Sequence, residues 1–242
     1  MASEQAGGGR RTSAARARLL GTATRIFYTE GIHSVGVDRI IAEAQVTRAT
    51  LYRHFTGKEE LVLAYIDQAD QGMRAGIEAA RSGKRTAAGP GDGEPADAGL
   101  ADAGPADAGP ATGAPAPGEP PAGEPSAADA VRAVARFITD GIRSPGFRGC
   151  AFLNAAAEYP DPAHPIHQAV LAHRQWFLET VTGLLARVGD EPADEAGRHF
   201  VMLRDGAMAA GCLFDPELIT ETFLRGVEGI LRVRGDRTAR AT

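Results

Sequence analysis

The chain has 242 residues, 43% of them hydrophobic, and this length accommodates one large domain or two modest ones. Its formal net charge is −5. It has only two cysteines, and this number excludes a disulfide scaffold and a zinc site built on a C-x-x-C pair. Neither a run of 18 uncharged apolar residues nor an apolar segment after the basic N-terminus occurs, so we expect a cytoplasmic protein with no membrane partner.

The charge is unevenly distributed along the chain. Residues 1–60 contain nine Lys or Arg and six Asp or Glu, a net +3, whereas residues 86–126 contain seven Asp or Glu and no Lys or Arg. The acidity is therefore concentrated in one segment. The mildly basic N-terminal part suits a polyanionic partner.

Three helices are predicted near the N-terminus, after a flexible basic arm at residues 1–12. In residues 13–30, apolar side chains recur every three or four positions, as on one face of a helix. Shorter helices are predicted at 37–44 and 48–54, and Thr47 is the expected N-cap of the second. Two short helices joined by a tight turn, after a longer one, describe a helix-turn-helix.

The helix at 48–54 separates a packing face from a reading face. Val46, Leu51 and Phe55 point inward in this pattern. The outward positions carry groups that can contact base edges or phosphates, and they are Arg48, Ala49, Thr50, Arg53 and His54. Thr47 directs free N–H groups toward a phosphate, while Tyr52 and Lys58 can reach the DNA backbone.

The stretch "VDRIIAEAQVTRATLYRHFTGKEEL" closely resembles the DNA-binding segment of the TetR family of bacterial transcriptional repressors, over roughly residues 13–65. The similarity lies in an Ile/Ala-rich helix, a V-[ST]-x-x-[TS]-L-Y-x-[HY]-F run and the K-E-x-L after it. It implies a DNA-binding domain at 13–57 in which these side chains face DNA: Arg48, Thr50, Tyr52, Arg53, His54 and Lys58. Gln45 stands in the turn where the family usually has Gly, and a left-handed backbone there would cost about 1 kcal/mol.

A connecting helix is predicted at 58–83, followed by a low-complexity segment at 84–126. That segment repeats an Ala-Asp-Ala-Gly unit, is punctuated by Pro and lacks aromatic residues. Such a composition buries too little surface to offset its ordering entropy, so we expect a disordered linker or an inserted loop.

The predicted helices continue to the end of the chain, and no run shows the two-residue alternation of a strand. Ser126 is the expected cap of the first of them, and "CAFLNAAAE" is predicted to form a short one. The remaining helices are predicted at 164–188, from Pro192 to about 214, and from Pro216 to about 233. The predicted fold is all-α, with an N-terminal three-helix helix-turn-helix DNA-binding domain, a helical ligand-binding and dimerisation domain at 127–234, and a tail at 235–242.

The resemblance implies that the C-terminal half forms a homodimer through about 193–213 and 217–233. Both segments are apolar on more than one face, and the alternative is burial within one chain. The same half is expected to bind a small organic effector, with these side chains as candidate lining: Phe137, Phe152, Asn154, Glu158, His173, Trp176 and Phe177. "GCAFLNAAAEYPDPAHP" resembles a segment of one branch of TetR-like regulators, which draws attention to Asn154 and Glu158. Each of these residues could instead belong to the core.

Other chemistry finds little support in the sequence. His164, His167 and His173 follow an H-x2-H-x5-H spacing that puts the last two on different helix faces, so no metal site is expected. Cys150 could be a redox sensor or a small buried apolar residue. No catalytic constellation occurs, and we expect no enzyme activity and no cofactor. The favoured function is a homodimeric repressor that binds a palindromic DNA operator and is released by its effector; the alternative is a helical small-molecule or partner-binding protein with a vestigial helix-turn-helix.

Overall fold

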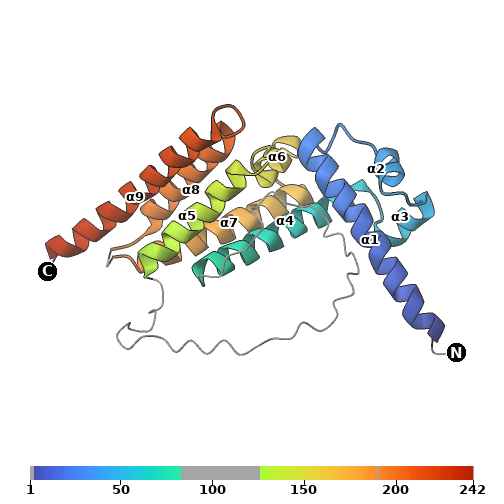
Figure 1. The fold of residues 1–242 in the computed structure, drawn as a ribbon, viewed down its shortest axis with the longest axis horizontal. Coiled ribbons are helices and arrows are strands. Elements are labelled where there is room, and N and C mark those ends of the chain that lie inside the picture. The colour runs from blue at the N-terminus through green and yellow to red at the C-terminus, as the bar shows by residue number, and fades with distance from the viewer. Residues whose placement is uncertain (1–2, 83–125, 190, 242) are drawn as a thin grey trace, which may run out of the picture.

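The computed structural model describes residues 3–82, 126–189 and 191–241, and the regular structure within these ranges is entirely helical (Figure 1). The predicted linker at 84–126 lies outside the described residues, apart from Ser126. In chain order the helices are α1 (Ser3–Glu30), α2 (Val37–Glu43), α3 (Arg48–His54), α4 (Lys58–Arg81), α5 (Ala127–Arg143), α6 (Ala151–Glu158), α7 (Pro165–Ala186), α8 (Asp194–Ala210) and α9 (Pro216–Ala241).

Most helix boundaries follow the predictions. The hydroxyl of Thr47 accepts a hydrogen bond from the Thr50 N–H at the start of α3, and Ser126 caps α5 in the same way. Helix α1 begins at Ser3 rather than at residue 13, so it starts within the segment that was predicted as a flexible arm.

The predicted start of α8 was wrong, because Pro192 lies outside the helix, which begins at Asp194. The Arg234 guanidinium, from α9, donates hydrogen bonds to the carbonyl oxygens of Gly189, Glu191 and Pro192. Arg234 therefore satisfies three main-chain carbonyls just before α8 begins.

The helices form two connected groups (Figure 1). Helices α1, α2 and α3 pack around a small core that includes Leu19, Ile40 and Leu51, all fully buried. Helix α4 leads from this group into a bundle in which α5 packs on α4 and α9, and α7 packs on α4 and α8. The DNA-binding candidates therefore lie at one end of an elongated molecule, and the C-terminus at the other.

Close packing of α4 on α5 depends on one glycine. A Cβ atom added at Gly76 would lie 2.1 Å from Cζ of Phe137, whose ring is buried against α4. We expect Gly76→Ala to lower the free energy of unfolding by about 1–3 kcal/mol, the usual cost of overpacking. Gly72 is the matched control, because nothing lies within 4 Å of its added Cβ and Gly72→Ala improves helix propensity. Urea unfolding of both variants tests this, and equal stability would contradict it.

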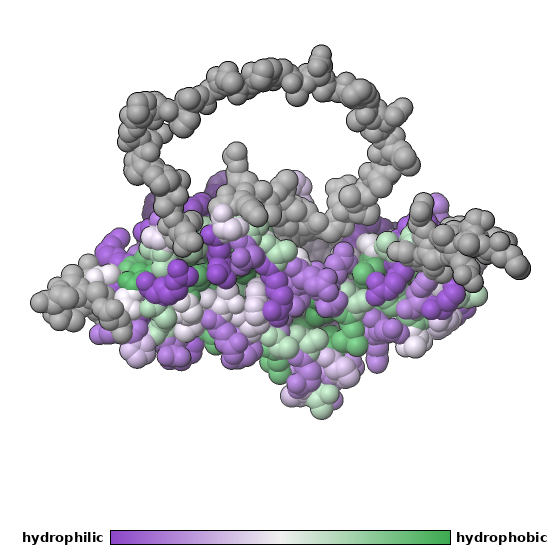
Figure 2. Space-filling model, turned by 90° about the horizontal axis from the view of Figure 1, so that it is seen from below, coloured by the Kyte–Doolittle hydropathy of each residue, from purple (hydrophilic) through white to green (hydrophobic). Residues whose placement is uncertain are grey.

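The outer surface mixes polar and apolar residues. In the face that Figure 2 shows, hydrophilic and hydrophobic residues form small interspersed groups. None of the helices in the described part of the chain is long and apolar enough to cross a membrane.

Candidate nucleic-acid interface

The turn between α2 and α3 holds Gln45 in the left-handed region, with φ of +52°. It is the one non-glycine residue with positive φ among the described residues. The N–H groups of Gln45 and Val46 donate to Ala42 and Ile41 in α2, so the turn is closed by main-chain hydrogen bonds. The backbone strain expected from the sequence is therefore present.

Replacing Gln45 with glycine should stabilise the domain. The left-handed backbone costs about 1–2 kcal/mol for a residue with a Cβ, and the greater freedom of glycine in the unfolded chain offsets part of it. We expect Gln45→Gly to raise the free energy of unfolding by about 0.5–1 kcal/mol. Ala42→Gly, at an exposed position within α2, should have the opposite sign. Denaturant unfolding measures both, and a destabilised Gln45→Gly variant would refute the prediction.

Helix α3 has the two faces that its sequence predicts. Leu51 and Phe55 are buried against α1 and α2, and Val46 is partly buried. Thr47, Arg48, Ala49 and Arg53 are exposed, Thr50 is half-buried, and Tyr52 is 51% exposed. An exposed tyrosine beside two exposed arginines presents hydrogen-bond donors outward from the same short helix.

Arg48 is held by a partner that the sequence did not reveal. Its guanidinium forms an ion pair with Asp38, in the first turn of α2, and Arg53 donates weakly to the Thr50 hydroxyl at 3.4 Å. Both Arg48 and Asp38 are exposed, and exposed pairs contribute little to stability. A phosphate or guanine can therefore replace Asp38 as the partner of Arg48.

His54 and Lys58 are less available than predicted. His54 is half-buried, and its Nε2 is buried without a hydrogen-bond partner. Lys58 is also half-buried, and desolvation lowers its pKa while the charge of Glu158 opposes that shift. The exposed members of the predicted reading face are therefore Thr47, Arg48, Ala49, Tyr52 and Arg53.

Glu158 does not lie with the predicted effector-binding side chains. Its carboxylate accepts hydrogen bonds from the main-chain N–H groups of Ile32 and His33, between α1 and α2. Nearby, the Tyr28 hydroxyl in α1 donates to the Gly149 carbonyl at 2.9 Å. Helix α6 is thus tied to the helix-turn-helix at both of its ends.

The other predicted pocket residues divide into two sets. Asn154 is exposed and donates to the Arg148 carbonyl, while Phe137 faces Gly76 in α4. The remaining four come together where α6 meets α7, and they are Phe152, His173, Trp176 and Phe177. Phe152 stacks on His173 with ring centroids 3.4 Å apart. The structure supplies an aromatic cluster, with Asn154 and Glu158 outside it.

His173 carries a perturbed pKa within that cluster. Burial lowers its pKa from 6.5 to about 4, although Asp70 faces its Nδ1 at 2.6 Å and acts in the opposite direction. Burial prevails because only 4% of the side chain is exposed. Hydrogen bonds from Arg74 and His173 lower the pKa of Asp70 despite its desolvation, so the pair consists of a neutral imidazole and a carboxylate near neutral pH.

This pKa shift predicts a pH-dependent stability. Between pH 6.5 and about 4 the unfolded chain binds a proton at His173 that the folded protein excludes, so stability falls as the pH falls through this window. The loss from this residue is at most about 3 kcal/mol. We expect His173→Gln, which keeps an N–H donor for Asp70, to show a shallower decline. Urea unfolding at several pH values measures it, and parallel curves for the two proteins would count against it.

Comparison with known proteins supports this interpretation of the N-terminal helices. Residues 19–65 match the family described as bacterial regulatory proteins, tetR family. Over 65 residues the chain is 35% identical to the HTH-type transcriptional activator FasR of Mycolicibacterium smegmatis, a match covering 27% of this chain and 30% of that protein. It is 33% identical over 63 residues to the HTH-type transcriptional regulator LmrA of Bacillus subtilis, covering 26% and 34% of the two chains. The match to these curated relatives thus spans about a third of their length.

The similarity to solved structures extends over nearly the whole length of the chain. The crystal structure of SCO4454, a TetR-family transcriptional regulator from Streptomyces coelicolor, is 64% identical and superposes with a TM-score of 0.74. The match covers 92% of this chain and 97% of that one. It includes the C-terminal bundle as well as the helix-turn-helix, and so the chain belongs to the TetR family of bacterial transcriptional regulators.

Proposed function

We propose that the protein is a homodimeric repressor whose α3 helices bind the two halves of a palindromic operator, and that a small organic effector releases it. The exposed row on α3 that contains Arg48, Tyr52 and Arg53 carries this proposal. In this proposal residues 13–57 form the DNA-binding domain and 127–234 the effector-binding and dimerisation domain. Two α3 helices about 34–36 Å apart would enter successive major grooves.

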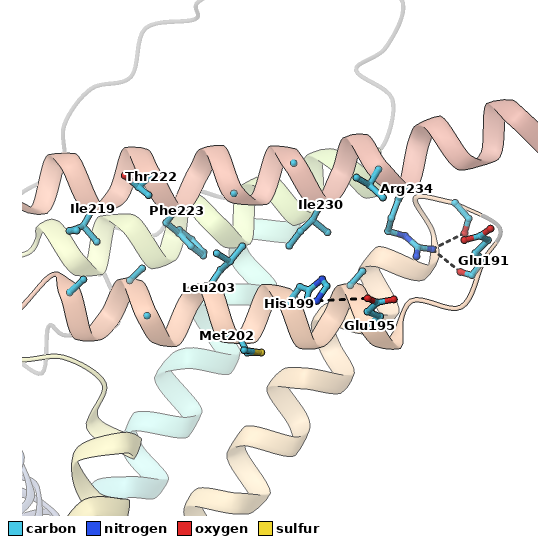
Figure 3. A pocket seen from close by; sticks show the side chains of 18 of the residues that line it. Glu191, Glu195, His199, Met202, Leu203, Ile219, Thr222, Phe223, Ile230 and Arg234 are labelled. Atoms are coloured by element: carbon cyan, nitrogen blue, oxygen red, sulfur yellow. Dashed lines mark hydrogen bonds and ion pairs between the residues drawn. The ribbon is translucent and has the colours of Figure 1, made fainter.

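The proposed dimer interface is the surface groove between α8 and α9 (Figure 3). The groove has a volume of about 900 Å³. Leu203 from α8 and Phe223 and Ile230 from α9 lie along it, and Met202 is 70% exposed at its edge. At one end lie the His199–Glu195 pair and the Arg234 hydrogen bonds to the carbonyls of Glu191 and Pro192. An apolar groove with a polar end is the kind of face that a second copy of the chain would cover.

In this proposal helix α6 couples effector binding to the position of the DNA-binding helices. Because Glu158 and Gly149 hold the α1–α2 loop and α1, a shift of α6 would move the helix-turn-helix as a unit. An effector that prefers the shifted arrangement would change the distance between the two α3 helices and so lower operator affinity.

The test is selection of bound sequences from a pool of random DNA duplexes, followed by footprinting of the protein on the most enriched duplex. The expected product is a palindrome whose half-sites are centred about one helical turn apart, bound in a salt-sensitive manner. With the duplex in excess over the protein, sedimentation should give complexes that contain two protein chains per palindromic duplex. Enrichment of no sequence, at any salt concentration tested, would reject the proposal.

Activation of transcription is the second candidate function, because the similar protein FasR is named as a transcriptional activator. A reporter gene placed downstream of the selected sequence distinguishes the two. Repression predicts that the protein lowers transcription and that removing it restores the signal. A signal that rises with the protein present would favour activation.

A further inference from the structure

A row of charged side chains runs from the surface into the interior between α4, α7 and α8. Arg74 and Asp70, on α4, have side chains that are 42% and 21% exposed. Arg174 on α7 and Asp205 on α8 are 28% and 23% exposed. Arg204, next to Asp205, is 3% exposed. The row was not foreseen from the sequence, and it extends from solvent to a buried guanidinium.

The charges in this row do not balance. Arg74 pairs with Asp70 at 2.7 Å, and Arg174 pairs with Asp205. Arg204 also donates to Asp205, at 2.9 Å, so three guanidiniums of the described row share two carboxylates. His173 contacts Asp70 and contributes no negative charge in either protonation state. Asp205 is shared by Arg174 and Arg204, so one positive charge of the row has no carboxylate of its own, and Arg204 is the buried member of the two.

Arg204 also has an unsatisfied donor. Its Nη1 donates to Asp205 and to Cys150 Sγ, at 3.2 Å, but its Nε is buried without a hydrogen-bond partner. A buried charged donor without a partner is costly, and a thiol is a weak acceptor. The arrangement is one that an anionic acceptor would complete.

The surroundings of Arg204 are aromatic. Its guanidinium carbon lies 5.4 Å from the centre of the Phe177 ring, and Arg74 lies 4.0 Å over Trp176 at the outer end of the row. Phe152 of α6 and His173 of α7 stack face to face, and the His173 ring also lies against Trp176. Flat side chains beside a row of guanidiniums favour a flat apolar molecule that carries one negative charge.

We propose that the effector is an aromatic carboxylate whose anionic group pairs with Arg204, and this inference rests on the proposed effector-released function. The carboxylate accepts from Nε and draws the guanidinium away from Cys150. Cys150 is the N-cap residue of α6 and follows Gly149, whose carbonyl holds Tyr28 of α1. Binding at Arg204 therefore acts on the start of α6, one of its two attachments to the DNA-binding helices.

Calorimetric titration with naphthoate, compared with its neutral isostere naphthamide, tests the charge requirement. We expect the full chain to bind naphthoate at least tenfold more tightly than naphthamide. Arg204→Met should remove that preference. Arg187→Met, at an exposed arginine at the end of α7, should keep it. No naphthoate binding, equal binding of the two compounds, or an unchanged preference in Arg204→Met would each overturn the inference.

Thermal unfolding without ligand provides a second, independent measurement. If the Arg204 charge is surplus, Arg204→Met leaves Asp205 paired with Arg174 and the melting temperature unchanged or higher. A melting temperature lowered by more than about 5 °C would show that Arg204 is a structural partner of Asp205, and would overturn the inference.

DNA binding separates this inference from the function on which it rests. Naphthoate should lower the affinity for the selected duplex in the native protein and not in Arg204→Met. Naphthoate binding by a protein that selects no duplex would reject the regulator proposal and leave the ligand site intact. Selective DNA binding by a protein that does not prefer naphthoate to naphthamide would reject the ligand site and leave the regulator proposal intact.

Discussion

Arg48→Ala combined with Arg53→Ala should abolish specific DNA binding while leaving the fold intact. Each arginine is exposed on α3, and removing one contact to a phosphate or base typically costs about 1–3 kcal/mol. A dimer loses four such groups, so a loss of roughly a thousandfold or more in affinity is expected. The Asp38 pair of Arg48 is exposed, and breaking it should change stability little.

Gel-shift titration at several salt concentrations measures both the loss of DNA affinity and the share of it that comes from phosphate contacts. The dependence of affinity on salt should also become shallower, by about one unit in the logarithmic slope for each phosphate that the variant no longer neutralises. Arg136→Ala with Arg187→Ala is the control, since it removes the same charge from exposed positions on α5 and at the end of α7. Equal loss in both double variants would mean that net charge, rather than the α3 surface, governs binding.

Asp38→Ala separates two roles of the ion pair. If Asp38 only occupies Arg48 in the free protein, its removal should strengthen DNA binding severalfold, because the guanidinium is released and a negative charge near DNA is removed. If Asp38 orients Arg48 toward a base, the same change should weaken selective binding. The ratio of affinities for the selected and a scrambled duplex distinguishes the two.

The N-terminal helices could be predicted closely because their signals are local. Thr47 as N-cap, buried Leu51 and Phe55, and the strained turn at Gln45 depend on residues within a few positions of one another. The half-buried state of His54 and Lys58 could not be predicted, because it depends on the environment set by other helices. For Lys58, that environment includes Glu158, one hundred residues further along the chain.

The C-terminal half shows the limit of sequence reasoning more clearly. Most helix boundaries there followed capping and apolar periodicity, but α8 begins at Asp194 rather than Pro192, and α9 continues to Ala241 rather than ending near residue 233. The aromatic part of the predicted site came together, because those side chains are apolar and share the interior. The sharing of Asp205 by two arginines was missed because Arg174 reaches it from α7, and contacts between residues 31 positions apart on different helices leave no pattern in the sequence.

Met202→Glu should convert the proposed dimer into monomers. Met202 is the most exposed apolar side chain on α8 and borders the groove between α8 and α9. In a two-fold interface the substitution would bury two carboxylates without partners. An uncompensated buried charge costs about 3–5 kcal/mol, so the dimer dissociation constant should rise by roughly a thousandfold or more.

Leu171→Glu is the matched control, because Leu171 is 44% exposed on α7 and does not line the groove. Sedimentation equilibrium should give a two-chain mass for the native protein and this control, and a one-chain mass for Met202→Glu. Circular dichroism should show the same helix content in all three. Operator binding should fall with the dimer, since a single α3 reads one half-site and loses the gain from linking two. A monomeric native protein, or a dimeric Met202→Glu variant, would place any self-association outside the α8–α9 groove.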